Sequence, residues 1–133
     1  DVLFVGRNAG LETLAGLGSL ERVDRLAVYD NPALDDVTAL GGVTELGVLE
    51  VVRNEALTAL DGLHDVVEVA GHVLVSENPS LVDVEALHSL EWVGTNLSIL
   101  GNGSLPTSAV DELVEAIGAA NVGGDIEVGD NGV

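Results

Sequence analysis

Apolar and polar positions repeat along this chain with a period of 23 or 24 residues, and an asparagine marks each period. Five and three residues before each asparagine stand apolar residues separated by a polar or variable one, a pattern typical of a half-buried strand. The asparagines are Asn8, Asn31, Asn54, Asn78, Asn102 and Asn131, of which the first five are 23, 23, 24 and 24 residues apart. Such a period with an in-register asparagine is typical of a leucine-rich-repeat solenoid.

After the asparagine of each regular repeat, apolar residues recur at every third position. In the second repeat they are Leu34, Val37, Leu40, Val43 and Leu46. We expect these residues to point inward from a tightly turning return segment that leads to the next strand. Successive strands would then stack in parallel, roughly 4.8 Å apart. The asparagine lies where the chain bends, so its amide can bond to backbone groups of its own and the adjacent repeat. The six asparagines are therefore expected to form a buried structural ladder.

The last repeat departs from this pattern, because 29 residues separate Asn102 from Asn131. Ser108 and Asp111 have the spacing of a capping box. Apolar residues then recur at helical spacing up to Ile117, and Gly118 offers a stop. We expect a helix over 108–117 that caps the coil, followed by a strand over 125–130.

The predicted fold is an α/β repeat solenoid, mostly β. It is a right-handed parallel β coil of about five turns with one C-terminal capping helix. At 133 residues the chain has room for one domain. We place the regular turns in residues 1–101 and the closing turn in 102–133. Only Phe4, Tyr29 and Trp92 are aromatic, so Leu, Val and Ala must build the core.

Composition narrows the function classes. The absence of cysteine excludes a disulfide scaffold, a thiolate zinc site and a cysteine nucleophile. The formal charge is −19, with 23 acidic residues against four basic ones, which makes nucleic acids and anionic membrane surfaces poor partners. No apolar run reaches the roughly 20 residues of a membrane span, so direct membrane insertion is not expected.

The best candidate surface is the outward face of the predicted sheet, two and four residues before each asparagine. Apolar residues there would form a diagonal band on a face that should otherwise be polar, and exposed apolar patches often mark partner sites. Alternatively, another part of the parent protein or a second copy covers this face. The candidate binding residues are Phe4, Tyr29, Glu50, Val52, Leu74, Ser76 and Leu100.

Directly before the asparagines, charges alternate in sign over Arg7, Asp30, Arg53 and Glu77. Stacked neighbours of opposite charge favour the correct register, so a structural role is expected more than ligand recognition.

Metal binding and catalysis find weaker support. His64 and His88 share one repeat position and could bind a metal, assisted by Asp61 and Glu85. Acidic return segments leave calcium open, although no calcium-loop motif is present. No phosphate-binding glycine loop and no catalytic triad is found, so we expect no cofactor, no metal site and no enzyme activity.

Two sequence segments resemble a known family: residues 28–34, Val-Tyr-Asp-Asn-Pro-Ala-Leu, and residues 75–81, Val-Ser-Glu-Asn-Pro-Ser-Leu. They resemble the receptor L-domain family, whose members are short leucine-rich-repeat-like solenoids in receptor ectodomains and bacterial surface proteins. The stretch from Asn102 to Ser108 is similar to the closing turn of the bacterial members. The resemblance implies binding of a protein or glycan and no catalysis.

We therefore expect a ligand-binding module of a secreted or cell-surface protein, whose targeting signal or anchor is not in this chain. The alternative is a structural spacer or self-associating repeat module with no small-molecule ligand.

Overall fold

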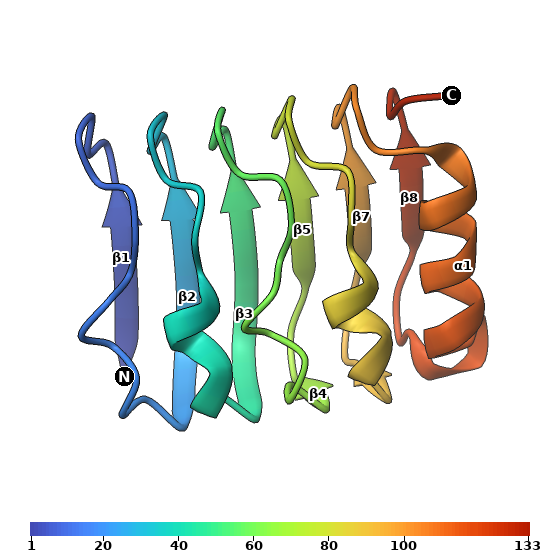
Figure 1. The fold of residues 1–133 in the computed structure, drawn as a ribbon. Coiled ribbons are helices and arrows are strands. Elements are labelled where there is room, and N and C mark those ends of the chain that lie inside the picture. Colours follow the sequence, from blue (N-terminus) through green and yellow to red (C-terminus); the bar gives the residue numbers. More distant parts are fainter.

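The computed structural model describes all 133 residues, which form one parallel β-sheet of eight strands and a single α-helix. Six strands lie side by side in chain order (Figure 1). They are β1 (Val2–Gly6), β2 (Arg22–Tyr29), β3 (Glu45–Val52), β5 (Val73–Ser76), β7 (Leu97–Leu100) and β8 (Ile126–Gly129). Two short strands, β4 (Glu68–Val69) and β6 (Trp92–Val93), extend the sheet beside β3. This architecture is compatible with the solenoid that the sequence predicts.

The strands pair at the spacing of the sequence repeat. Leu26 of β2 lies opposite Leu49 of β3, and Leu49 lies opposite Val73 of β5. Equivalent residues of successive repeats therefore stack on one another, as predicted. Because side chains alternate between the two faces of a strand, this register places the apolar rows on one face. Leu26, Leu49 and Val73 are completely buried there.

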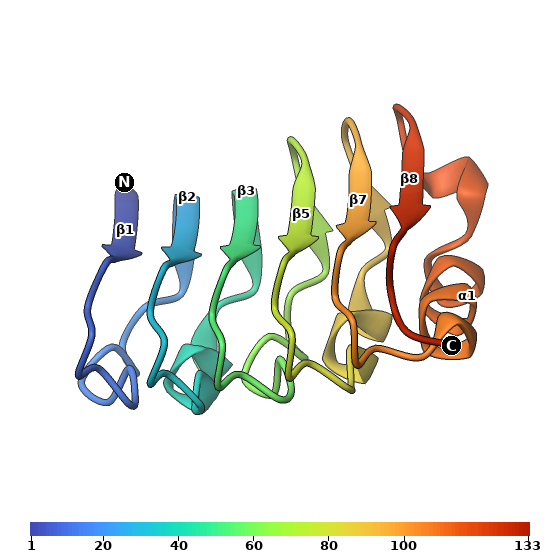
Figure 2. The same ribbon diagram turned by 90° about the horizontal axis from the view of Figure 1, so that it is seen from above.

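The return segments form a second layer that covers the inner face of the sheet (Figure 2). Two of them contain 3₁₀ helices, η1 (Thr38–Gly42) and η2 (Glu85–Ser89), and a third, η3 (Ala119–Asn121), follows the α-helix. The apolar positions follow backbone turns of three residues, with hydrogen bonds such as Leu17 N–H to the Leu14 carbonyl and Leu63 N–H to the Leu60 carbonyl, in repeats with and without a 3₁₀ helix. The core of 31 buried apolar residues lies between the two layers.

The apolar rows are less buried at the two edge strands than at the inner strands. Leu3 and Val5 of β1 are half-buried, and Val128 of β8 is 48 % exposed. An inner strand has a neighbouring repeat on both sides, whereas an edge strand has one on a single side. The inward side chains of an edge strand are therefore covered from one side only. Burial along one apolar row therefore depends on whether the strand lies inside the sheet or at its edge.

The α-helix, α1 (Thr107–Ile117), begins one residue before its predicted start. The predicted capping box is wrong, because Pro106 is the N-cap and no side chain caps the first turn. The Thr107 hydroxyl instead donates to the carbonyl of Gly132, 2.7 Å away. Gly118 ends the helix at φ 85°, as expected. The buried face of α1 covers the return segment of the preceding repeat beside η2, so the helix caps that layer.

The asparagines form the predicted ladder. Asn31, Asn54, Asn78 and Asn102 are fully buried. Both the backbone N–H and Nδ2 of Asn54 donate to Oδ1 of Asn78, at 3.0 and 3.2 Å. Nδ2 of Asn54 also donates to the carbonyl of Val28 in the preceding repeat, 3.0 Å away. The same bonds recur from Asn8 to Asn131, always donated toward the C-terminal neighbour, so the ladder has a direction.

The residue directly before each asparagine has a left-handed backbone. The φ angles lie between 53° and 69° at Arg7, Asp30, Arg53, Glu77, Gly101 and Asp130. Five of these six residues carry a side chain in a region that favours glycine. The bend that leads each strand into the ladder therefore carries local backbone strain.

Candidate functional site

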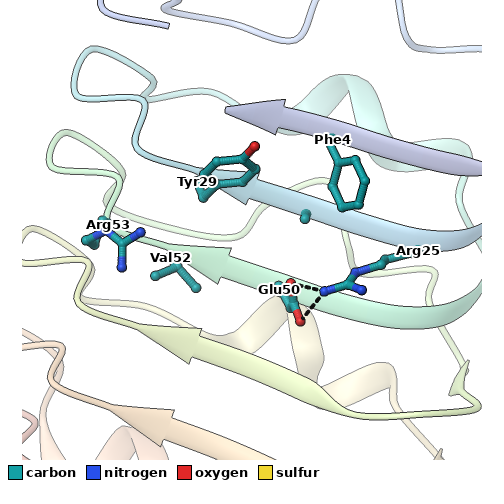
Figure 3. A pocket seen from close by; sticks show the side chains of 7 residues that line it. Phe4, Arg25, Tyr29, Glu50, Val52 and Arg53 are labelled. Carbon is teal, nitrogen blue, oxygen red and sulfur yellow. Dashed lines mark hydrogen bonds and ion pairs between the residues drawn. The ribbon is translucent and has the colours of Figure 1, made fainter. Parts of the chain in front are cut away.

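A pocket with a volume of about 280 Å³ lies on the outward face of β1, β2 and β3 (Figure 3). Seven residues line it: Phe4, Arg25, Ala27, Tyr29, Glu50, Val52 and Arg53.

The pocket exists because a small residue lies between two large ones. The parallel register places Ala27 of β2 between Phe4 of β1 and Glu50 of β3. Ala27 is only 3 % exposed and forms the floor. Its methyl group leaves space that a longer side chain at this position would fill.

Glycine positions one aromatic wall. Gly6 of β1 is the partner of Tyr29 of β2. A Cβ atom on Gly6 would lie 2.2 Å from Cζ of Tyr29, so the tyrosine ring lies directly over the glycine backbone. Tyr29 is half-buried and Phe4 is 55 % exposed. The rings of Tyr29 and Phe4 lie on neighbouring strands at the same side of the pocket (Figure 3).

An ion pair between Arg25 and Glu50 lines the pocket beside Phe4 (Figure 3). Nη2 of Arg25 donates to both carboxylate oxygens of Glu50, each at 3.0 Å. The guanidinium carbon also lies 5.5 Å from the centroid of the Phe4 ring, within the range of a cation–π interaction. Nε2 of His72 lies 2.8 Å from Oε1 of Glu50. These contacts hold Arg25 and Glu50 in one arrangement without a ligand.

The pKa of Glu50 reflects these partners. Partial burial by itself would raise the pKa, but hydrogen bonds and positive charge from Arg25 and His72 outweigh burial and lower it below the ordinary value. Glu50 is therefore a carboxylate at neutral pH.

Arg53 lies at the remaining corner of the pocket. Its Nε donates to Oδ1 of Asp30 at 2.6 Å and its Nη2 donates to Oδ2 at 3.2 Å. The hydrogen bond from Arg53 lowers the pKa of Asp30, and Asp30 in turn raises the pKa of Arg53. Of the alternating charges directly before the asparagines, this is the one pair that forms a salt bridge. The predicted charge ladder is therefore realised only between β2 and β3.

The sequence identified part of this pocket. Four of the seven candidate binding residues line it, namely Phe4, Tyr29, Glu50 and Val52. The other three lie on β5 and β7, outside the pocket. Leu74 and Leu100 are half-buried, and Ser76 is buried.

Arg25, Ala27 and Arg53 were not among the candidates. The sequence pattern could have indicated Arg25. Outward positions alternate every second residue along a strand, so the sixth residue before the asparagine faces outward like the fourth and the second. The same row contains His72, whose Nε2 lies 2.8 Å from Oε1 of Glu50.

The geometry around His64 and His88 does not support metal binding. No three side chains of His, Cys, Asp or Glu gather to hold an ion, at His64 and His88 or elsewhere. None of the helices combines the length and apolar character of a membrane span.

The chain was compared with models of protein families, with curated proteins and with solved structures, and none of the three comparisons finds a match.

Proposed function

We propose that this chain is a non-enzymatic binding module that holds a protein or glycan ligand against the outward face of its sheet, in the pocket of β1, β2 and β3. The observation that carries the proposal is the pocket itself, which combines an apolar floor and walls with charged side chains at two corners. Ligand sites typically combine apolar lining with a few polar groups that fix orientation.

The pocket is already arranged for binding. Arg25 is held by Glu50 and Arg53 by Asp30, so neither guanidinium has to be ordered by a ligand. Tyr29 is held over Gly6. Because ordering a side chain at an interface costs about 0.5–1.5 kcal/mol, side chains that are fixed beforehand favour affinity.

For the whole chain we infer a right-handed leucine-rich-repeat-like solenoid of about five turns, of the receptor L-domain kind, belonging to a secreted or cell-surface protein. The in-register pairing of equivalent residues and the asparagine ladder support the repeat architecture. The strongly acidic surface and the absence of cysteine are compatible with this location.

Filling the pocket tests the function. Ala27→Leu places a larger apolar side chain on the floor, whereas Ser98→Leu is the matched control at the equivalent position of β7. Each protein is screened against a displayed peptide library and a printed glycan array. Ligands of the unmodified protein should be lost with Ala27→Leu and kept with Ser98→Leu. Equal capture by Ala27→Leu would show that the pocket is not the site.

The structural alternative is favoured by one observation, the exposed Val2 and Phe4 on edge strand β1. A module that self-associates through this strand should increase in mass with concentration in light scattering after size exclusion. A constant monomer mass over a wide range of concentrations contradicts self-association.

A further inference from the structure

The geometry points to a more specific ligand, and we propose that the pocket takes one neutral sugar unit of a glycan. The apolar face of the sugar ring would pack against Tyr29 and Phe4, and its hydroxyl groups would bond to the Arg25–Glu50 pair. This inference rests on the proposed function, since it names the ligand class of the same pocket.

Size sets the first limit. The volume of about 280 Å³ lies just below the range of roughly 300–1,000 Å³ that holds drug-sized ligands. One ring with its substituents matches this space. A longer ligand would have to extend beyond the pocket across the open sheet face, as the rest of a glycan chain can.

The aromatic wall favours a ligand with an apolar face. Tyr29 presents a ring that lies against the backbone of Gly6, and Phe4 presents a second ring on the adjacent strand. Aromatic side chains supply large apolar surfaces, and tyrosine adds a hydroxyl at its edge. A sugar ring has C–H groups on its faces and hydroxyl groups at its rim, so it can bury a face here while keeping its rim polar.

The polar end of the pocket matches hydroxyl groups. Arg25 has five N–H donors, and only Nη2 bonds to Glu50, so the hydrogens on Nε and Nη1 remain for a ligand. Glu50 provides acceptor oxygens beside these donors. A hydroxyl group both donates and accepts, so neighbouring hydroxyls can use both partners. A carboxylate can use only the arginine, and an ammonium group only the glutamate.

Charge favours an uncharged ligand. The two arginines in the pocket are balanced by Glu50 and Asp30, so the pocket offers no excess positive charge to an anion. The net charge of −19 repels anions at longer range. A cation that approaches Phe4 would meet the positive charge of Arg25, whose guanidinium carbon lies 5.5 Å from the ring centroid. An uncharged ligand is not repelled by the net negative charge or by Arg25, and it needs no excess positive charge in the pocket.

A peptide matches the pocket less well than a glycan. Extended peptides gain much of their affinity by adding a strand to a free sheet edge. The floor of the pocket is β2, which pairs with β1 on one side and β3 on the other. The main chain under the pocket is therefore already bonded, and a peptide lying on it has only side-chain contacts available.

The test uses the whole chain and an array with three sets of probes: neutral oligosaccharides of hexose and N-acetylhexosamine, the same glycans carrying sialic or uronic acid, and linear peptides. Neutral glycans should bind, with at least a tenfold loss for Ala27→Leu and for Tyr29→Ser. Tyr29→Phe should keep the ring contact, and Ser98→Leu should bind like the unmodified protein. Far-UV circular dichroism establishes that each variant is folded.

The outcomes separate the two proposals. Peptides that bind, and that are lost with Ala27→Leu, would overturn the sugar inference while the proposed function stands. A preference for the acidic glycans would also overturn the inference, because it requires an excess of positive charge. If no probe depends on Ala27, both the inference and the proposed function fall.

Discussion

The asparagine ladder predicts that one buried amide has a large effect on stability, and Asn54 is the most informative position. Its Oδ1 accepts from the backbone N–H of Asn31 at 3.3 Å and from Nδ2 of Asn31 at 3.2 Å. Its own Nδ2 donates to the carbonyl of Val28 and to Oδ1 of Asn78. Asn54→Ala removes these four bonds, and a fifth from Nδ2 to the carbonyl of Val52, from the fully buried interior.

The cost follows from the groups left behind. Two buried N–H donors of Asn31 lose their acceptor, and each such group costs about 1–3 kcal/mol. The expected loss is therefore about 2–6 kcal/mol, before the lost bonds to Val28 and Asn78 are counted. A domain of this size is stable by about 5–15 kcal/mol, so the variant should be close to unfolding.

Asn8→Ala is the matched control. Asn8 is exposed, so water can replace its side-chain bond to Asn31, and the backbone N–H of Asn8 still donates to Asn31 Oδ1. Its loss should cost about 1 kcal/mol or less. Urea unfolding followed by far-UV circular dichroism measures both values. A free energy of unfolding for Asn54→Ala within about 1 kcal/mol of that for Asn8→Ala would refute the argument from buried donors.

Asn54→Asp separates the shape of the amide from its hydrogens. The carboxylate keeps the acceptor for Asn31 but loses both donors, and it brings a buried negative charge to the oxygens of Val28 and Asn78. At pH 7 it should be less stable than Asn54→Ala, because an unpaired buried charge costs more than a lost amide. Stability equal to the unmodified protein would mean that the donors of Asn54 contribute nothing.

Three further predictions concern the bend and the pocket. Glu77 has a left-handed backbone with φ 55°, so Glu77→Gly should stabilise the fold by about 1 kcal/mol and Glu77→Val should destabilise it. Urea unfolding measures both changes, and the opposite order would contradict backbone strain at this position. Because the pKa of Glu50 is lowered on folding, its ionisation stabilises the protein above the ordinary value of 4.5, and this contribution is lost as pH falls through the folded pKa. Arg25→Gln should raise the midpoint of the Glu50 carboxyl titration in NMR, and an unchanged midpoint would refute this. Gly6→Ala should displace the Tyr29 ring at a cost of about 1–3 kcal/mol, seen as shifted ring-proton resonances; unshifted resonances would contradict the contact.

The repeat made much of the sheet predictable. Leu26 and Leu49 occupy the same position in successive repeats, and each has a near-identical neighbour above and below. A burial pattern repeated in register leaves few alternatives, because a slip of one residue would turn every apolar side chain outward. The repeat does not show how far an end strand is covered, as at Val128 on edge strand β8.

The start of the closing helix is where the prediction failed. The spacing of Ser108 and Asp111 is a local signal, and local signals compete with contacts that are distant in sequence. Thr107 bonds to the carbonyl of Gly132 across 25 residues, and Pro106 precedes it at the N-cap. No short-range pattern reveals such a contact.

The pocket was predictable only in part, because it depends on differences between repeats. Its floor requires Ala27 to lie between larger neighbours on both adjacent strands, and its wall requires the ring of Tyr29 to lie over Gly6. The floor is a relation between three strands and the wall a relation between two. The row that contains Phe4 indicated which face to consider, but neither the conformations of the side chains nor the pairing of Arg25 with Glu50 follows from spacing.

The direction of the asparagine ladder has a consequence for how such a chain can lengthen. Each interior asparagine receives two bonds from the preceding one and gives two to the next, so the interior layers of the ladder share one bonding pattern. A duplicate of residues 55–78 inserted after Asn78 would find a donor on one side and an acceptor on the other, with β1, β2 and β3 untouched. Reach and recognition are thus separately adjustable: the number of layers sets how far the module extends, and the three N-terminal strands set what it holds.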